Sequence, residues 1–458
     1  MESHFHFLVL RYSAVMMPFK EINVLKEVVI MDNKSAFCGR ISTDSGIKNG
    51  YILTDINSGI IEEVNFSKDM PEFFSGDIFK YDDNYIIYPG DFNCHSHPEH
   101  SIYTDIINKS WDLGTWCRNT IYKYSSVLKN EHIYLGCLRA FSRMLLLGDT
   151  SVMVSYYCHG NKGNTLDNEV LRAAKDVGIR LYFGRMNYDI MNEDAYEGKK
   201  VSQKSYYESP SEAEKNFLAL LNECYPNTIT VAPSLHSIHA SSKDAIINGI
   251  NLAFDHNRYI QFHLSEDKGD VDLSLKLYGF RPIEFLESLL KNGEVKSLSH
   301  VILSDCVWIN DNESDIINRY GMKVVLNPRM NHRIKTGSAN LTKLLEKNIT
   351  IYLGTDGEAS NDDLSIMHER DFLKDRYKNI DESIIDLLGS TPLKLGEGFV
   401  GNIAKNSFCD LKILDSKNNV KDVFVGGNQI IRDYKLISMD IEKDIEEPLK
   451  QSLSNLFL

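Results

Sequence analysis

The chain has 458 residues, of which 43% are hydrophobic, and a formal net charge of −14 at pH 7. Two domains are expected, because an ordinary domain holds about 100–200 residues and even an α/β barrel about 250. The acidic balance disfavours binding to nucleic acid and to anionic membranes, which both require a basic surface. No stretch of about 20 apolar residues offers a membrane span, and eight cysteines without Cys-x-x-Cys spacing indicate reduced thiols in a cytoplasmic protein.

Short alternating runs with Gly or Asn turns, typical of β-hairpins, occupy both ends of the chain. Strand-like patterning begins at residue 24, and the clearest runs are 50–53, 60–64, 410–414 and 423–428. The pair His4 and His6 lies ahead of them without partner residues, so we interpret it as structurally neutral.

Between residues 85 and 360, β-branched runs alternate with helical patterns, which predicts repeated β-α units and a parallel sheet. Helix-like stretches are 134–147, 167–177, 242–256 and 311–319. Eight candidate strands end near His97, Tyr156, Phe183, Ser234, His263, Asp305, Asn327 and Asp356. Eight units predict a (β/α)8 barrel, in which active sites lie at the C-terminal ends of the strands.

A candidate metal site follows from residues at three of these strand ends. His95 and His97 are two residues apart, so their rings share one face of a strand and can reach one ion at about 2.0–2.1 Å. His263 and Asp356 end two later strands. Alone, His263 could be a core histidine and Asp356 a turn residue before glycine. Three histidines with one aspartate together predict a catalytic zinc or iron site that keeps a position open for water.

In this order, His-x-His after a Pro-Gly turn, a His-x-x-Glu strand end and a Gly-Thr-Asp strand end resemble the amidohydrolase superfamily, specifically its guanine deaminase and chlorohydrolase-like aminohydrolase branch. The resemblance covers most of the chain and includes Asn93, 112–116, 148–150, 263–281, 328–331 and 356–361. It implies a TIM-like (β/α)8 barrel at 89–400 and a small β-sandwich domain built from both chain ends, 18–88 plus 401–440. The mixed-charge segment 441–458 is expected to be a solvated C-terminal helical tail.

The resemblance also implies an activity: hydrolytic deamination of a small heterocyclic amine, such as a purine, pterin or triazine, by hydroxide on one divalent metal, zinc or alternatively iron. His95, His97, His263 and Asp356 would bind the metal. Asp356 would also accept the proton of the attacking water, and Glu266 would protonate the substrate. A homodimer or larger homo-oligomer acting on a small molecule is expected.

Three further positions match substrate-binding positions of the family: His236, Trp116 and Asn361. A structural role is the alternative for His236, and stabilisation of a turn is the alternative for Asn361. For Glu266, the alternative is a surface carboxylate beside Asp267.

Asp305 departs from the family pattern, in which the sixth strand ends in a histidine that contacts the attacking water and the substrate. His300 lies five residues earlier, at the opposite end of the strand. Asp305 could bind a second cation, contact a basic group of the substrate, or act as an altered acid-base residue. Two other activities therefore stay open: hydrolysis of another non-peptide C–N bond (amide, lactam or formimino), and a catalytically silent metal-binding paralogue.

Overall fold

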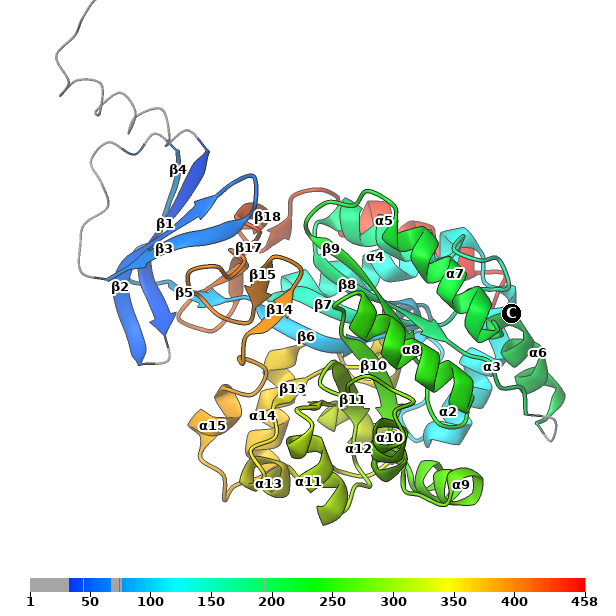
Figure 1. Ribbon diagram of the computed structural model, residues 1–458. Coiled ribbons are helices and arrows are strands. Elements are labelled where there is room, and N and C mark those ends of the chain that lie inside the picture. Colours follow the sequence, from blue (N-terminus) through cyan, green and yellow to red (C-terminus); the bar gives the residue numbers. More distant parts are fainter. Residues whose placement is uncertain (1–32, 44, 67–73, 75, 193–194, 458) are drawn as a thin grey trace, which may run out of the picture.

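The computed structural model describes residues 33–43, 45–66, 74, 76–192 and 195–457. These residues form a parallel barrel and, beside it, a mixed, mainly antiparallel sheet (Figure 1). The pair His4 and His6, the first predicted strand and the predicted domain start at residue 18 lie outside the described residues. Among the described helices, none combines the length and the apolar character that a membrane span requires.

The barrel consists of eight parallel strands that pair in chain order. They are β6 (Asp91–Ser96), β7 (Asp149–Tyr156), β8 (Arg180–Asn187), β9 (Ile229–Leu235), β10 (Ile260–Leu264), β11 (Val301–Asp305), β12 (Lys323–Leu326) and β13 (Ile351–Leu353). Its first and last strands meet where the amides of Thr355 and Asp356 both donate to the carbonyl oxygen of His95 at 3.1 Å. The predicted (β/α)8 architecture is confirmed.

Helices connect the strands and surround the barrel (Figure 1). The four predicted helices correspond to α4 (Asn130–Leu146), α5 (Asp167–Val177), α8 (Lys243–Asp255) and α11 (Asp311–Arg319). Capping residues define where these helices begin and end. The Ser242 hydroxyl accepts from the amide of Ala245 at 3.1 Å at the start of α8, and Gly178 ends α5 with φ 85°.

The other described helices are shorter or were not predicted. They are α2 (Leu113–Asn119), α3 (Ile121–Tyr124), α6 (Glu197–Tyr206), α7 (Pro210–Leu221), α9 (Lys268–Tyr278), α10 (Pro282–Lys291), α12 (Pro328–Arg333), α13 (Leu341–Glu346), α14 (Ile366–Arg376) and α15 (Glu382–Asp386), with 3-10 turns at Pro98–Tyr103, Ser125–Val127 and Glu358–Ser360.

Strands from both ends of the chain form the second sheet. Before the barrel come β1 (Lys34–Thr43), β2 (Gly46–Asp55), β3 (Ile60–Asn65), β4 (Asp77–Lys80) and β5 (Ile86–Pro89); after it come β16 (Leu411–Leu414), β17 (Val420–Val425), β18 (Asn428–Arg432) and β19 (Lys435–Leu436). The two groups join where β5 pairs antiparallel with β16. This sheet is antiparallel except where β1 pairs in parallel with β4 and β5. A separate hairpin, β14 (Leu393–Leu395) and β15 (Gly398–Val400), precedes β16. The expected small β domain from both ends is confirmed, whereas its exact boundaries stay a prediction.

The C-terminal segment differs from the solvated helix that its charges suggested. A π-helical turn (Ile441–Glu446) continues into α16 (Glu447–Leu453), and α16 packs on α4. Ile445, Leu449 and Leu453 are buried. Their spacing of four places them on one helical face, so an apolar stripe among the charges docks this segment onto the barrel.

Candidate active site

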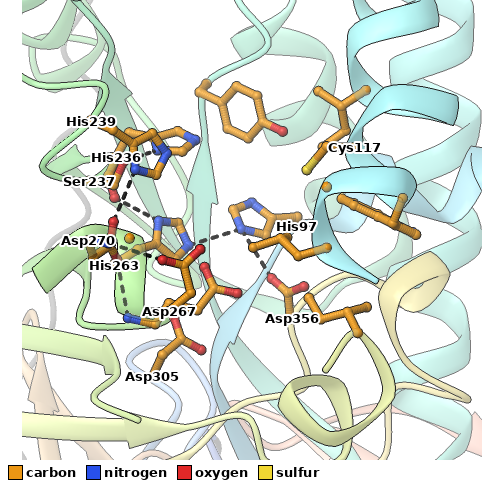
Figure 2. A pocket seen from close by; sticks show the side chains of 18 of the residues that line it. His97, Cys117, His236, Ser237, His239, His263, Asp267, Asp270, Asp305 and Asp356 are labelled. Atoms are coloured by element: carbon orange, nitrogen blue, oxygen red, sulfur yellow. Dashed lines mark hydrogen bonds and ion pairs between the residues drawn. The ribbon is translucent and has the colours of Figure 1, made fainter. Parts of the chain in front are cut away.

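Four side chains converge at the C-terminal end of the barrel: His95, His97, His263 and Asp356. Figure 2 shows three of them, His97, His263 and Asp356. Nε2 of His263 lies 3.2 Å from Nε2 of His95 and 3.3 Å from Nε2 of His97. Oδ1 of Asp356 lies 3.3 Å from Nε2 of both His95 and His97. The four ligand atoms all lie within 4.8 Å of one another. The structure thus brings the four predicted metal ligands together.

The remaining ring nitrogen of each of these histidines faces an acceptor. Nδ1 of His95 lies 3.0 Å from the side-chain oxygen of Gln261. Nδ1 of His97 lies 2.6 Å from the backbone oxygen of Ser155, and Nδ1 of His263 lies 2.8 Å from the backbone oxygen of His236. A carbonyl oxygen only accepts, so each Nδ1 carries the hydrogen and each Nε2 points a lone pair at the centre. Lone pairs and a carboxylate this close repel one another unless a cation lies between them. The donor set therefore fits a divalent metal ion.

The backbone around Asp356 is arranged for this close approach. Asp356 itself has a left-handed φ of 56°, and its Oδ2 accepts from the Ser360 hydroxyl at 2.5 Å. A Cβ atom at Gly354 would lie 2.7 Å from the Cβ of His95, so glycine lets the last strand reach the first. Burial opposes ionisation, yet the imidazoles of His95 and His97 hold the pKa of the Asp356 carboxyl below its ordinary value.

A cavity of about 400 Å³ opens next to the ligand cluster. Its wall contains five large aromatic side chains, namely Trp116, Tyr122, Tyr157, Tyr188 and Tyr206. Flat aromatic walls suit a planar ligand, because rings stack face to face or edge to face. The size and lining of the cavity therefore fit a small heterocycle.

Glu266 and His236 both line this cavity, with opposite protonation tendencies. Burial, reinforced by the charge of Asp305, raises the pKa of the Glu266 carboxyl well above its ordinary value. Burial lowers the pKa of the His236 imidazole well below its ordinary value. Burial therefore favours the protonated carboxyl of Glu266 and the neutral imidazole of His236, whose ring centre lies 5.4 Å from that of His263.

The two remaining predicted substrate contacts lie differently. Trp116 lines the cavity, and its indole N–H donates to the carbonyl oxygen of Ala359 at 3.1 Å. Asn361 is not among the described residues that line the cavity. Its amide nitrogen donates to the carbonyl oxygen of Thr355 at 2.9 Å and to the carboxyl of Glu369 at 2.8 Å. Asn361 therefore stabilises the loop that carries Asp356.

Asp305 ends β11 at the cavity and is completely buried. Its Oδ1 accepts from the side-chain amides of Asn327 at 2.9 Å and Asn331 at 3.1 Å. The structure places His300 at the opposite end of the strand, where its carbonyl oxygen accepts from the amide of Ile260 at 3.0 Å. His300 therefore does not occupy the position of the family's sixth-strand histidine.

Several residues of the site were not predicted from the sequence. Gln261 alternates with His263 on one face of β10, so the strand period of two could have found it. His100 stacks on His97 with ring centres 4.7 Å apart and lines the cavity.

His97, Glu99 and His100 also lie close enough to hold an ion, but Nε2 of His97 faces the first cluster and its Nδ1 contacts the Ser155 carbonyl. A second ion would have no free nitrogen on His97.

Comparison with known proteins gives a consistent picture. A model of the amidohydrolase family matches residues 86–430. A 5-methylthioadenosine/S-adenosylhomocysteine deaminase of Halothermothrix orenii is 25% identical over 466 residues, covering 93% of this chain and 100% of that protein. A 5'-deoxyadenosine deaminase of Methanopyrus kandleri is 24% identical over 390 residues, covering 79% and 84%. The crystal structure of an adenosine deaminase from Xanthomonas campestris with bound zinc has the same fold, with a TM-score of 0.75 at 19% identity, over 93% of this chain and 98% of that one.

Proposed function

The chain belongs to the amidohydrolase family, and we propose that it is a metal-dependent aminohydrolase that deaminates a small heterocyclic amine by hydrolysis. One observation carries the proposal: three imidazole Nε2 atoms and the Asp356 carboxylate converge beside Glu266 in an aromatic cavity. Relatives named as adenosine-type deaminases support it. Purine, pterin and triazine amines are planar rings of the kind that the aromatic wall of the cavity suits.

The residues fit one divalent ion, held by His95, His97, His263 and Asp356. We propose zinc rather than iron, because imidazole with carboxylate is a ligand set that zinc accepts readily, and a structural neighbour contains zinc. When bound, such an ion lowers the pKa of a water from about 15.7 toward about 7 and so supplies a nucleophile at neutral pH.

The chain's own residues then move the protons. Asp356, held below its ordinary pKa, is ionised and can accept a proton from the attacking water. Glu266, held above its ordinary pKa, can donate a proton to the ring nitrogen that gains electrons and then to the departing amine. Trp116 and the tyrosine side chains orient the ring, and neutral His236 offers it a hydrogen bond.

Ammonia release tests this function. The zinc-loaded protein is incubated with aminated purine nucleosides, pterins and triazines, and ammonia is measured with a coupled assay. We expect release from at least one of these classes, and none from the metal-free protein. A fully metal-loaded protein that releases no ammonia from any of them would contradict the proposal and favour a silent metal-binding paralogue.

We also propose a cytoplasmic homodimer or larger homo-oligomer. All eight cysteines lie within the described residues and are thiols rather than disulfides, which suits a reducing compartment. Light scattering after size-exclusion chromatography measures the mass of the assembly, and a mass equal to one chain would contradict the proposed oligomer.

A further inference from the structure

We propose that the substrate binds as an amidine-type cation whose protonated nitrogen donates a hydrogen bond to Asp305. Amidinium groups, guanidinium groups and aminated heterocycles basic enough to carry a proton belong to this class. The inference rests on the proposed hydrolysis of a C–N bond and narrows its substrate.

The carboxylate of Asp305 has an incomplete set of hydrogen-bond partners among the described residues. Its Oδ1 is held by Asn327 and Asn331, but its Oδ2 has no hydrogen-bond partner among the described residues, although the side chain is completely buried. Both amide donors are neutral. A buried carboxylate is costly unless a cation compensates it, so this one is suited to receive a cation from the cavity.

The backbone aims this carboxylate at the cavity. Val301 and Leu303 of β11 pack outward with the helices, so strand alternation would also point residue 305 outward. Left-handed φ values of 77° at Asp305 and 47° at Cys306 break the alternation, and Asp305 lines the cavity instead. Such backbone angles cost free energy in residues other than glycine and gather at functional sites.

Asp305 lies beside the proposed metal ligands, where the reacting group of a substrate would bind. Asp305 pairs with Leu264 of β10, directly after His263. It is nevertheless not one of the four residues whose ligand atoms converge on the ion. A substrate group between the ion and Asp305 would therefore be the group that reacts.

The charges lining the cavity also favour a cation. Two other lining carboxylates are already engaged: Asp267 caps α9 through the amide of Asp270 at 3.0 Å, and Asp270 contacts His239 at 3.1 Å. Lys199 is the one lysine or arginine among the described lining residues. Asp305 thus remains as an acceptor without a positive partner.

The reaction balances for such a substrate without any redox partner. The water oxygen bonds to the amidine carbon, and the bond from that carbon to the departing nitrogen breaks. Asp356 accepts the first proton of the water, and Glu266 donates its own proton to the departing nitrogen. The second water proton then restores Glu266, and the proton held by Asp356 leaves with ammonia as ammonium. Asp305 holds the nitrogen that stays. An amidinium ion and water become an amide and ammonium, so the charge is unchanged.

A matched pair of ligands tests the inference: benzamidine, a planar cation, and benzamide, its neutral isostere. Calorimetric titration of the zinc-loaded protein should give about 10- to 100-fold tighter binding of benzamidine, the range for a hydrogen bond to a charged group. Asp305→Asn should reduce the preference to within about threefold, whereas Asp267→Asn, which removes an engaged carboxylate, should retain it.

Equal binding of the two ligands, undetectable binding of benzamidine, or a preference that survives in Asp305→Asn would overturn the inference. The wild-type comparison decides by itself if Asp305→Asn does not fold. Ammonia release is measured in parallel to separate the two proposals. Turnover of neutral amines without any preference for benzamidine overturns this inference alone, and a preference without turnover of any substrate overturns the proposed function alone.

Discussion

Replacement of Glu266 by glutamine should abolish most of the activity and leave the metal site intact. The carboxyl lines the cavity, is not one of the four metal ligands, and is kept protonated by burial and by the charge of Asp305. Glutamine has the same shape but cannot transfer a proton. A positioned acid-base group contributes about 10²–10⁴-fold, so we expect kcat for ammonia release to fall by that factor, with KM changed by less than about threefold.

The assay combines steady-state kinetics with elemental analysis of the same samples. Asp267→Asn is the matched control, since it neutralises the next carboxylate in the chain while asparagine still caps α9, and its kcat should stay within about threefold of wild type. The reasoning fails if Glu266→Gln retains wild-type kcat, or if it loses metal in proportion to activity, which would make Glu266 a structural residue.

Two further predictions concern stability. Lys412 is buried and forms an ion pair with Asp91, which keeps a second partner in Arg370. Lys412→Met should therefore lower the free energy of unfolding by about 1–3 kcal/mol, whereas Lys378→Met at an exposed pair should cost less than about 1 kcal/mol; urea denaturation measures both. Burial raises the pKa of Glu99 from 4.5 to about 8. The contribution of Glu99 to stability should therefore fall as the pH rises from about 4.5 to 8, and Glu99→Gln should raise the unfolding temperature at pH 9 but not at pH 4.5. Equal wild-type and Glu99→Gln unfolding temperatures at pH 9 would contradict this assignment.

The barrel was predictable because its strands are short, apolar and separated by helices with clear caps. β11 ends at Asp305 and α5 spans 167–177, as the patterns indicated. Two strand ends differ from the prediction: β8 continues to Asn187, four residues beyond the predicted Phe183, and pairing of β13 stops at Leu353, three residues before the metal aspartate. Beyond it the chain contacts β6 through the amides of Thr355 and Asp356 instead of a regular ladder.

Other features depend on three-dimensional context that no local pattern carries. The inward turn of Asp305 results from left-handed backbone angles, and its partners Asn327 and Asn331 come from the next strand end and its helix. Asn361 matched a family motif, yet its amide donates to the Thr355 carbonyl oxygen and to the Glu369 carboxyl, and it is not among the described residues that line the cavity.

Metal content tests the central claim most directly. Elemental analysis of the purified, zinc-incubated protein should find about one zinc per chain in the wild type and strongly reduced zinc in His263→Ala and Asp356→Asn. His239→Ala should keep its zinc, because His239 lines the cavity but contacts Asp270 rather than the ligand cluster. A wild type that binds no zinc, or ligand variants that bind as much as the wild type, would contradict the account.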